Sequence, residues 1–249
     1  MKHNNRPLSS YLGLLIIVAV FVSGCLGQQE VDEISKEIKL KTEDGFTIVG
    51  NFYQGDSNSG VILLHMLNRN RNDWNDFAGQ LKKEGYNILS IDLRGHGQST
   101  DKDGRVVNWQ TFSANDFNDM TLDVKVAKQF LEEKSIDDVS IVGASIGANI
   151  AVSYAAEDSE IKTVILLSPG LDYRGVKPDA DVKDYGNRSV LIVASKDDEY
   201  SAMSSKNLIE LAVGKKELKL YENAGHGTKM FLNTDLDKII INWLMENGN

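Results

Sequence analysis

Hydrophobic and polar positions follow two different periods along most of this 249-residue chain. Residues 34–41 alternate apolar and polar side chains, an Asp-Gly pair follows, and residues 46–53 form a second strand-like segment. This arrangement predicts a β-hairpin, because Asp-Gly suits the tight turn between two paired strands. Six further strands are predicted, most of them continuous apolar runs as expected of strands covered on both faces: residues 61–64, 87–92, 139–142, 164–167, 190–193 and 218–221.

Segments with helical spacing separate these strands. Between residues 74 and 81 the apolar side chains recur at helical spacing, which predicts an amphipathic helix. A hairpin followed by repeated strand–helix units predicts an α/β fold, in which a mostly parallel eight-stranded sheet carries helices on both faces. Neither an internal repeat nor a second domain is visible in the pattern. The remaining helices are predicted over residues 117–133, 148–156, 202–213 and 235–246.

The N-terminal segment has a different character. Lys2 and Arg6 give it a basic start, and residues 11–22 form an apolar run that is short for a bilayer-spanning helix. The Val-Ser-Gly-Cys motif that ends at Cys25 resembles a lipobox, which implies an exported protein held at the cell membrane by a lipid on Cys25. An uncleaved anchor helix with an incidental cysteine is the alternative. The predicted parts are a signal peptide (1–24), a lipidated tether (25–33) and a folded domain (34–249).

The composition is ordinary for a globular protein, with 41% hydrophobic and 25% charged residues, and the length suits one domain with a sizeable core. Cys25 is the only cysteine, so the chain cannot form an internal disulfide. The net charge is −9, and it becomes −11 without residues 1–24, because that segment holds two basic residues and no acidic one. An acidic surface argues against nucleic-acid binding and against electrostatic adhesion to anionic lipids.

One serine stands between small residues where a predicted strand meets a predicted helix. The pentapeptide GASIG, centred on Ser145, follows the strand at 139–142 and precedes the helix at 148–156. A serine in such a sharp turn is held in a strained conformation, and flanking glycines leave room for it. The arrangement is typical of a nucleophilic serine, whose hydroxyl needs an adjacent base such as histidine.

Five segments in order make residues 34–246 resemble the α/β-hydrolase family: LLHM, RGHGQS, GASIG, ASKDDEYS and AGHG. The connection from residue 168 to residue 190 is short, whereas many members of this family carry a large lid there. It leaves room for a loop and a short helix, and residues 100–113 add a small cover. This minimal lid resembles the dienelactone-hydrolase and serine-aminopeptidase-like esterase groups, and it predicts a shallow, partly open pocket.

The resemblance implies a catalytic triad in the chain order serine, acid, histidine. Of the four histidines, only His226 follows Ser145, so His226 is the implied base. Asp197 and Asp198 compete for the acid. Laying residues 194–195 on the His-Gly-x-x-Asp pattern of the family places Asp198 on the acid and leaves Asp197 to face solvent or brace the loop. More distant candidates for the acid are Asp172 and Asp179.

The resemblance also implies an oxyanion hole of two backbone N–H groups. One belongs to Ile146, directly after the nucleophile, and the other to Leu67, with Met66 as the less favoured choice. Met66 stands where relatives usually have glycine, and His65 is expected to brace this loop rather than to act in catalysis. The RGHGQS segment is expected to be structural, its glycines allowing a tight turn and its arginine or histidine bonding nearby loops.

The function implied is a membrane-anchored serine hydrolase that cleaves small or exposed carboxylic esters through Ser145, His226 and Asp198. A peptidase, thioesterase, carbon–carbon hydrolase or acyltransferase could use the same residues, since fold does not set substrate. A non-catalytic exported binding protein is the alternative from another class. No cofactor is expected, and the histidines lack the spacing of a metal site. The sequence leaves the oligomeric state open.

Overall fold

The computed structural model describes Met1, Lys2 and residues 35–248. Apart from Met1 and Lys2, the predicted signal peptide lies outside the described residues, as do Cys25 and the tether. The chain from Ile34 to Asn249 forms one compact unit. Among the described residues, no helix has both the length and the apolar character that crossing a bilayer requires.

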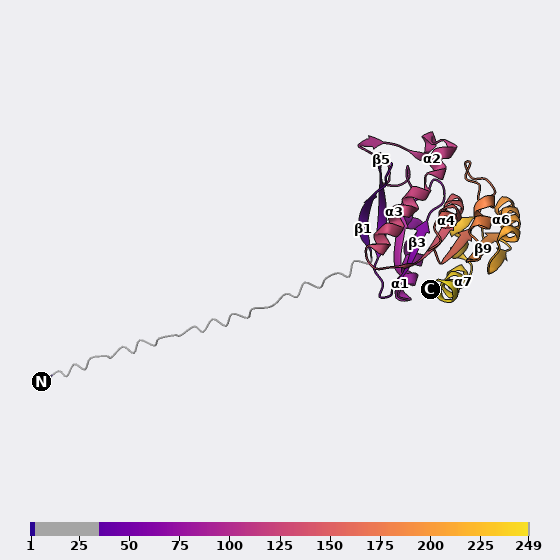
Figure 1. Cartoon of the computed structure of the whole chain (residues 1–249). Helices are drawn as coiled ribbons and strands as arrows, with labels where there is room; N and C mark the ends of the chain where they lie inside the picture. Colours follow the sequence, from indigo (N-terminus) through magenta and orange to yellow (C-terminus); the bar gives the residue numbers. More distant parts are fainter. Residues whose placement is uncertain (3–34, 249) are drawn as a thin grey trace. The chain divides into compact units, whose positions relative to one another are not determined.

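A ten-stranded sheet runs through this unit in the order β10-β9-β8-β7-β3-β4-β2-β5-β6, with β1 paired to β2. Neighbours from β10 to β4 are parallel, and the remaining pairs are antiparallel. Figure 1 shows β1 and β9 toward opposite sides of the domain. The strands are β1 (Lys36–Lys41), β2 (Phe46–Tyr53), β3 (Ser59–Leu64), β4 (Asn87–Ile91), β5 (Asp101–Lys102), β6 (Arg105–Val106), β7 (Asp138–Ala144), β8 (Thr163–Leu167), β9 (Ser189–Ser195) and β10 (Lys216–Tyr221).

The predicted, mostly parallel sheet is confirmed, but the predicted number of eight strands is too low. The additional strands β5 and β6 have two residues each, so no hydrophobic pattern marks them. Backbone geometry defines them instead: Asp103 and Gly104 form their turn with φ of 50° and 80°. The Gly104 N–H donates to the Asp101 carboxylate at 2.9 Å, and the Thr47 hydroxyl of β2 donates to the same carboxylate.

Helices cover both faces of the sheet, as predicted. α3 to α6 pack on one face, and α1 and α7 on the other. Ile62 and Leu64 of β3 face the first group and Val61 and Leu63 the second, because successive side chains of a strand point to opposite faces. The helices are α1 (Asn75–Lys83), α2 (Ala114–Asn118), α3 (Thr121–Glu132), α4 (Ile146–Glu157), α5 (Asp179–Asp184), α6 (Glu199–Leu211) and α7 (Leu236–Asn247), with short 3-10 helices η1 (Arg71–Trp74), η2 (Trp109–Thr111) and η3 (Gly227–Leu232).

The single helix predicted over residues 117–133 is wrong, because α2 and α3 are separate. Ser113 starts α2 early through a capping box: its hydroxyl accepts the Asp116 N–H, and the Asp116 carboxylate accepts the Ser113 N–H. A turn after α2 then lets both Phe117 and Met120 enter the core. Together with β5, β6 and η2, α2 forms a small cover, and Figure 1 shows β5 and α2 along one margin of the domain.

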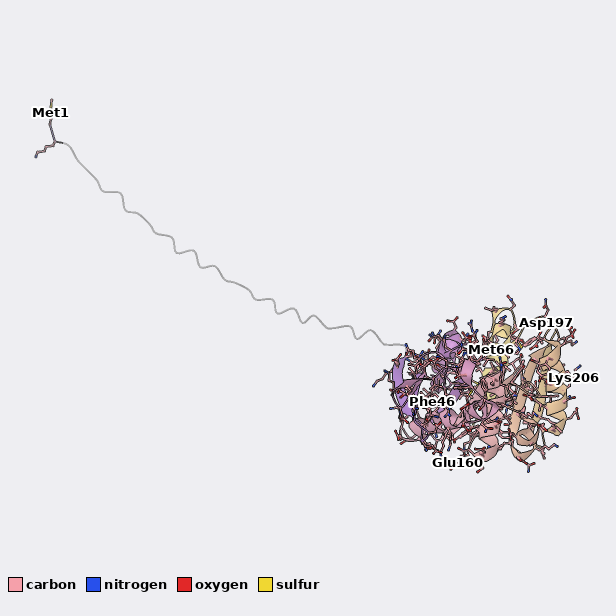
Figure 2. The ribbon with its side chains drawn as sticks, turned by 90° about the horizontal axis from the view of Figure 1, so that it is seen from above. Met1, Phe46, Met66, Glu160, Asp197 and Lys206 are labelled. Atoms are coloured by element: carbon pink, nitrogen blue, oxygen red, sulfur yellow. The ribbon has the colours of Figure 1, made fainter. Side chains whose placement is uncertain are left out.

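The loops after the parallel strands leave the sheet at one edge, since parallel neighbours end on the same side. Figure 2 shows Met66, which follows β3, and Asp197, which follows β9, in the half of the domain away from Glu160, which precedes β8. Ligands of open α/β sheets bind outside the carboxyl ends of the strands. The predicted site residues within the domain all lie in loops at this edge or at the start of α4.

Candidate active site

Ser145 forms the turn between β7 and α4 with φ 56° and ψ −122°, a strained conformation for a residue with a side chain. The neighbouring glycines make the turn sterically feasible. A Cβ on Gly143 would lie 2.1 Å from the Gly147 carbonyl oxygen, and a Cβ on Gly147 would lie 2.6 Å from the Leu64 carbonyl oxygen. The strand-to-helix turn therefore packs backbone directly on backbone, and it holds the Ser145 side chain at the carboxyl edge of the sheet.

Asp198 and His226 meet at the same edge. Asp198 precedes the first residue of α6, His226 lies in the loop after β10, and Asp198 Oδ2 is 2.6 Å from His226 Nδ1. A carboxylate on Nδ1 orients the ring and places the proton of the neutral imidazole on that nitrogen. Within the described part of the chain, Nε2 of His226 makes no hydrogen bond. This nitrogen can therefore accept a proton from a nucleophilic side chain.

Asp197 has a different task from its neighbour Asp198. Its carboxylate accepts the N–H groups of Ala224 and Gly225 at 3.2 to 3.3 Å, and it also accepts the Ser195 hydroxyl. The Ser195 hydroxyl and these amides hold the pKa of Asp197 below its usual value. Asp197 therefore braces the loop that leads into His226, while Asp198 contacts the imidazole itself.

Tyr173 is a site residue that sequence reasoning missed. It lies between β8 and α5, its ring meets the His226 ring edge-on with 6.4 Å between centroids, and its hydroxyl is 3.0 Å from Ser201 Oγ. Burial raises the pKa of Tyr173 to about 12, against the opposing effect of the hydrogen bond to Ser201. No motif surrounds Tyr173 in the sequence, so only the folded chain brings it to His226.

Ser145 and His226 do not share a hydrogen bond: among the described residues, none joins Ser145 Oγ to His226 Nε2. Catalytic hydrogen bonds are often long in the absence of substrate and tighten when it binds. The structure thus brings Asp198 and His226 into direct contact, and it places Ser145 at the same edge of the sheet.

The two predicted oxyanion donors are the backbone N–H groups of Ile146 and Leu67. Ile146 is the first residue of α4, and N–H groups in the first turn of a helix have no partner within the helix. Leu67 lies in the turn after β3, beside Asn68 with φ 58°. Neither N–H has an acceptor among the described residues. Their role in binding an oxyanion stays a prediction.

Met66 fills space that the usual glycine of the family would leave open. Its side chain is buried, and a Cβ on Gly227 would lie 2.4 Å from the Met66 sulfur. The methionine therefore packs against the segment that directly follows His226. His65 braces the same loop: its Nδ1 lies 2.7 Å from the Met66 carbonyl oxygen, and its Nε2 accepts the Leu93 N–H at 3.0 Å.

The RGHGQS segment has the structural contacts expected of it. Arg94 is buried and pairs with Asp123 and Asp44. The His96 ring stacks on Trp109 of the cover, with 5.5 Å between centroids and 7° between planes. Burial and the neighbouring His65 lower the pKa of His96 to about 4, so the ring is neutral at physiological pH. The described residues contain no group of three or more His, Cys, Asp or Glu side chains that could hold a metal ion.

Comparisons with known proteins point in the same direction as this geometry. The profile of the family described as "Serine aminopeptidase, S33" matches residues 55–185. The AB hydrolase superfamily protein YisY of Bacillus subtilis is 30% identical over 155 residues, which cover 57% of this chain and 52% of that protein. The chain thus spans about half the length of this curated relative.

Solved structures share the fold over most of the chain. The Pyrococcus furiosus esterase Pf2001 is similar with a TM-score of 0.72 at 18% identity, covering 86% of this chain and 93% of that one. The esterase domain of a Rhodothermus marinus protein has a TM-score of 0.67 at 15% identity, covering 86% and 100%. Acetyl xylan esterase 1 from a Thermoanaerobacterium species has a TM-score of 0.69 at 16% identity, covering 86% and 84%.

Proposed function

Because the chain belongs to the serine aminopeptidase S33 family of α/β-hydrolases, we propose that it is a serine hydrolase that cleaves carboxylic esters. The observation that carries this proposal is the 2.6 Å contact between Asp198 and His226, made at the sheet edge where Ser145 stands in its strained turn. A nucleophile, a base and an orienting acid are the parts that acyl transfer needs.

The reaction proceeds in two half-reactions. Ser145 Oγ attacks the ester carbonyl carbon while His226 Nε2 takes the serine proton, and the carbonyl oxygen becomes an oxyanion held by the N–H groups of Ile146 and Leu67. The carbon–oxygen bond to the alcohol then breaks, and the alcohol leaves with the proton from His226. Water attacks the acyl-serine by the same route, which releases the carboxylic acid and restores Ser145. Asp198 stabilises the imidazolium that forms in each half-reaction.

Two observations support esters as the substrate class. The solved neighbours from Pyrococcus, Rhodothermus and Thermoanaerobacterium are named esterases. The connection between β8 and β9 contains only a tight turn and the six-residue helix α5, so small or exposed acyl groups suit the site better than long buried chains. The family description favours a second candidate, an aminopeptidase that uses the same residues on an amide bond.

A substrate panel tests the proposal. Purified protein is assayed on p-nitrophenyl acetate and butyrate, on an acyl thioester and on aminoacyl p-nitroanilides. We expect the highest kcat/KM on the short esters, and a loss of at least about a thousandfold in Ser145→Ala. Ser153→Ala is the matched control, because Ser153 lies on the same helix α4 and hydrogen-bonds to Asp181 instead. Undiminished ester hydrolysis in Ser145→Ala contradicts the proposal, and preference for the anilides favours the aminopeptidase.

We further propose that a lipid on Cys25 holds the enzyme at the cell membrane. The support is the basic start, the short apolar run and the lipobox-like motif of the N-terminal segment. We expect Cys25→Ser to remove metabolic labelling by radioactive fatty acid and to move the protein out of the membrane fraction. Unchanged lipid labelling in Cys25→Ser contradicts the lipobox interpretation. A wild-type protein that carries no lipid label and still stays in the membrane fraction favours an uncleaved anchor helix.

A further inference from the structure

The end of β8 bonds to both halves of the candidate site. The Ser145 N–H donates to the carbonyl oxygen of Leu167, the last residue of this strand, at 2.8 Å. The next residue, Ser168, is fully buried, and its hydroxyl oxygen accepts the Gly227 N–H at 2.9 Å. Gly227 directly follows His226. Two adjacent residues therefore hold the backbone of the nucleophile and the backbone beside the histidine.

The segment that carries His226 needs a hydrogen-bond acceptor from outside. His226 is the N-cap residue of η3, and N–H groups in the first turn of a helix have no partner within it. The side chain of an N-cap residue often accepts such an N–H. His226 makes no capping bond of this kind, and its ring contacts Asp198 instead. The Ser168 hydroxyl supplies the acceptor from the end of β8.

Ser168 is itself held in a fixed direction. Its φ is 50°, in the left-handed region that few residues with a side chain adopt. Its N–H donates to the Val193 carbonyl oxygen of β9 at 2.7 Å, and its carbonyl oxygen accepts the Tyr173 hydroxyl at 3.2 Å. Both backbone groups of Ser168 are thus bonded to neighbouring structure, and the strained backbone between them directs the hydroxyl to Gly227.

Met66 encloses Gly227 from a second side. The glycine is buried with φ 58°, and a Cβ on it would lie 2.4 Å from the Met66 sulfur. This packing limits the space around the backbone after His226 but gives it no direction, because dispersion contacts are not directional. The hydrogen bond to the Ser168 hydroxyl is directional, so it determines where within that space the Gly227 N–H lies.

We propose that Ser168 is a positioning residue for the catalytic histidine: its hydroxyl fixes the backbone at Gly227 and so sets where the His226 ring lies relative to Ser145. This inference rests on the proposed serine-hydrolase function. Among the described residues no hydrogen bond joins the side chains of Ser145 and His226, so their relative position depends on backbone contacts such as those at the end of β8. Ser168 acts through Gly227, and it takes no proton during the reaction.

The test compares Ser168→Ala with Ser99→Ala in the full-length protein. Ser99 is the matched control, because it is also fully buried and its hydroxyl accepts a backbone N–H, that of Val49, at 2.8 Å. Val49 lies in β2, and the strands β3 and β4 separate β2 from β7, the strand that leads to Ser145. Each substitution leaves one buried N–H without its acceptor, so both variants should lose stability to a similar degree.

The rate is expressed per reactive serine, counted by exhaustive titration with a fluorophosphonate, so that a loss of folded protein does not lower the measured kcat. We expect Ser168→Ala to lower kcat on p-nitrophenyl butyrate about tenfold, with KM changed less than twofold, because a displaced imidazole impairs proton transfer and not binding. Ser99→Ala keeps the wild-type kcat. An equal loss of kcat in both variants, or a raised KM at unchanged kcat in Ser168→Ala, overturns the inference.

The wild-type protein separates this inference from the function on which it rests. If the wild-type protein hydrolyses the ester and reacts with the fluorophosphonate, but Ser168→Ala has the same kcat, the inference is wrong and the function stands. If the wild-type protein neither hydrolyses the ester nor reacts with the probe, the proposed function itself fails.

A second variant covers the case in which Ser168→Ala does not fold. Ser168→Gly also removes the hydroxyl, and glycine adopts a φ of 50° without the steric cost that a side chain has there. We expect the same loss of about tenfold in kcat per reactive serine, since the Gly227 N–H again lacks its acceptor. A wild-type kcat in Ser168→Gly overturns the proposed role of the hydroxyl.

Discussion

Two adjacent aspartates illustrate how one position in the chain separates two roles. The Asp198 carboxylate contacts the His226 ring, whereas the Asp197 carboxylate contacts the backbone of the loop that leads to it. Both side chains lie at the end of β9 and carry the same charge. They differ only in the direction in which the turn before α6 presents them, and this direction decides which of them can orient the imidazole.

The first prediction exploits this pair. Asp198→Asn should lower kcat by about a hundred- to ten-thousandfold, because an amide at this place favours the wrong imidazole tautomer and no longer stabilises the imidazolium. Asp197→Asn removes the same charge and should lower kcat less than tenfold, since the ring keeps its own carboxylate. The measurement is steady-state hydrolysis of p-nitrophenyl butyrate by both variants. Equal losses in the two variants would show that the assignment of the acid is wrong.

At the scale of residues, motif and spacing could predict only part of the site. Ser145, His226 and Asp198 are recognisable because a strand, a turn and the chain order of the family restrict where each can stand. Tyr173 and Ser201 have no such signature. Tyr173 lies in the connection between β8 and α5, and Asn149 of α4 holds this connection by hydrogen bonds on either side of Tyr173. Contacts of this kind are tertiary, and a single sequence does not reveal them.

At the scale of elements, the turn between β7 and α4 is the most constrained piece of the fold. It has to bring the start of α4 against the end of β3, and Gly147 lies where the two backbones come closest. The carbonyl oxygens of Leu64 and His65 would be 2.6 and 2.7 Å from a Cβ at this position. Neither oxygen can move without disturbing the sheet, so an added methyl group has nowhere to go.

The second prediction follows from this packing. Gly147→Ala should lower the free energy of unfolding by about 3 kcal/mol, the upper end of the usual cost of overpacking. Gly79→Ala is the matched control: Gly79 lies in α1, a Cβ there meets nothing within 4 Å, and alanine should raise stability by about 1 kcal/mol through helix propensity. Urea denaturation followed by circular dichroism measures both. A Gly147→Ala protein as stable as wild type would contradict the close approach of the two backbones.

Elements with a strong hydrophobic period could be predicted, whereas those defined by polar contacts could not. The central strands are visible because both faces of each strand are buried, and α1 and α7 because each has one apolar face. The strands β5 and β6 and the division of α2 from α3 depend on a turn at Asp103 and on a capping box at Ser113. These are interactions of one or two residues, and they leave no periodic signal.

At the scale of the whole molecule, a buried histidine pair links the cover to the body of the domain. His96 stacks on Trp109 of the cover and lies 5.0 Å from the His65 ring, which braces the loop after β3. Both rings are buried, and burial lowers the pKa of each. The cover packs against His96, and His65 braces the loop that carries the predicted oxyanion donor Leu67. Both elements therefore depend on histidine rings for which burial favours the neutral form.

The third prediction concerns acid stability. The pKa of His96 is about 4 in the folded state and about 6.5 when the chain is unfolded, so the unfolded state takes up a proton first as the pH falls. The stabilising effect of a neutral His96 is complete above pH 7, and it is lost between about pH 6.5 and pH 4. By pH 4 this loss amounts to roughly 3 kcal/mol.

His96→Phe isolates this contribution, because phenylalanine can keep the stack on Trp109 and cannot titrate. The variant should lose less stability than wild type between pH 7 and pH 4, and groups common to both proteins, such as the buried Asp123, cancel in the comparison. Urea midpoints at the two pH values provide the measurement. An identical pH dependence in both proteins would show that His96 is not protonated on unfolding in this range.

The overall architecture was the most predictable level, because a repeated strand–helix order permits few arrangements. The order of strands in the sheet comes from the structure alone. The same holds for the contact between the cover and the connection after β8, where Asn118 donates to the Gly175 carbonyl oxygen and Arg174 lies over the Trp109 ring. The hydrophobic pattern states which faces are buried, but not which neighbours bury them. The candidate site also depends on this level, since Ser145, Asp198 and His226 follow three different strands, β7, β9 and β10.

Mapping the adduct of a fluorophosphonate probe shows directly which serine is the nucleophile. The protein is treated with a slight excess of probe, digested and analysed by mass spectrometry, with Ser145→Ala and Ser153→Ala treated in parallel. We predict one adduct per chain, on Ser145, in wild type and in Ser153→Ala, and none in Ser145→Ala. A wild-type protein without an adduct, or with its adduct on another serine, would contradict the account of Ser145 as the nucleophile of this enzyme.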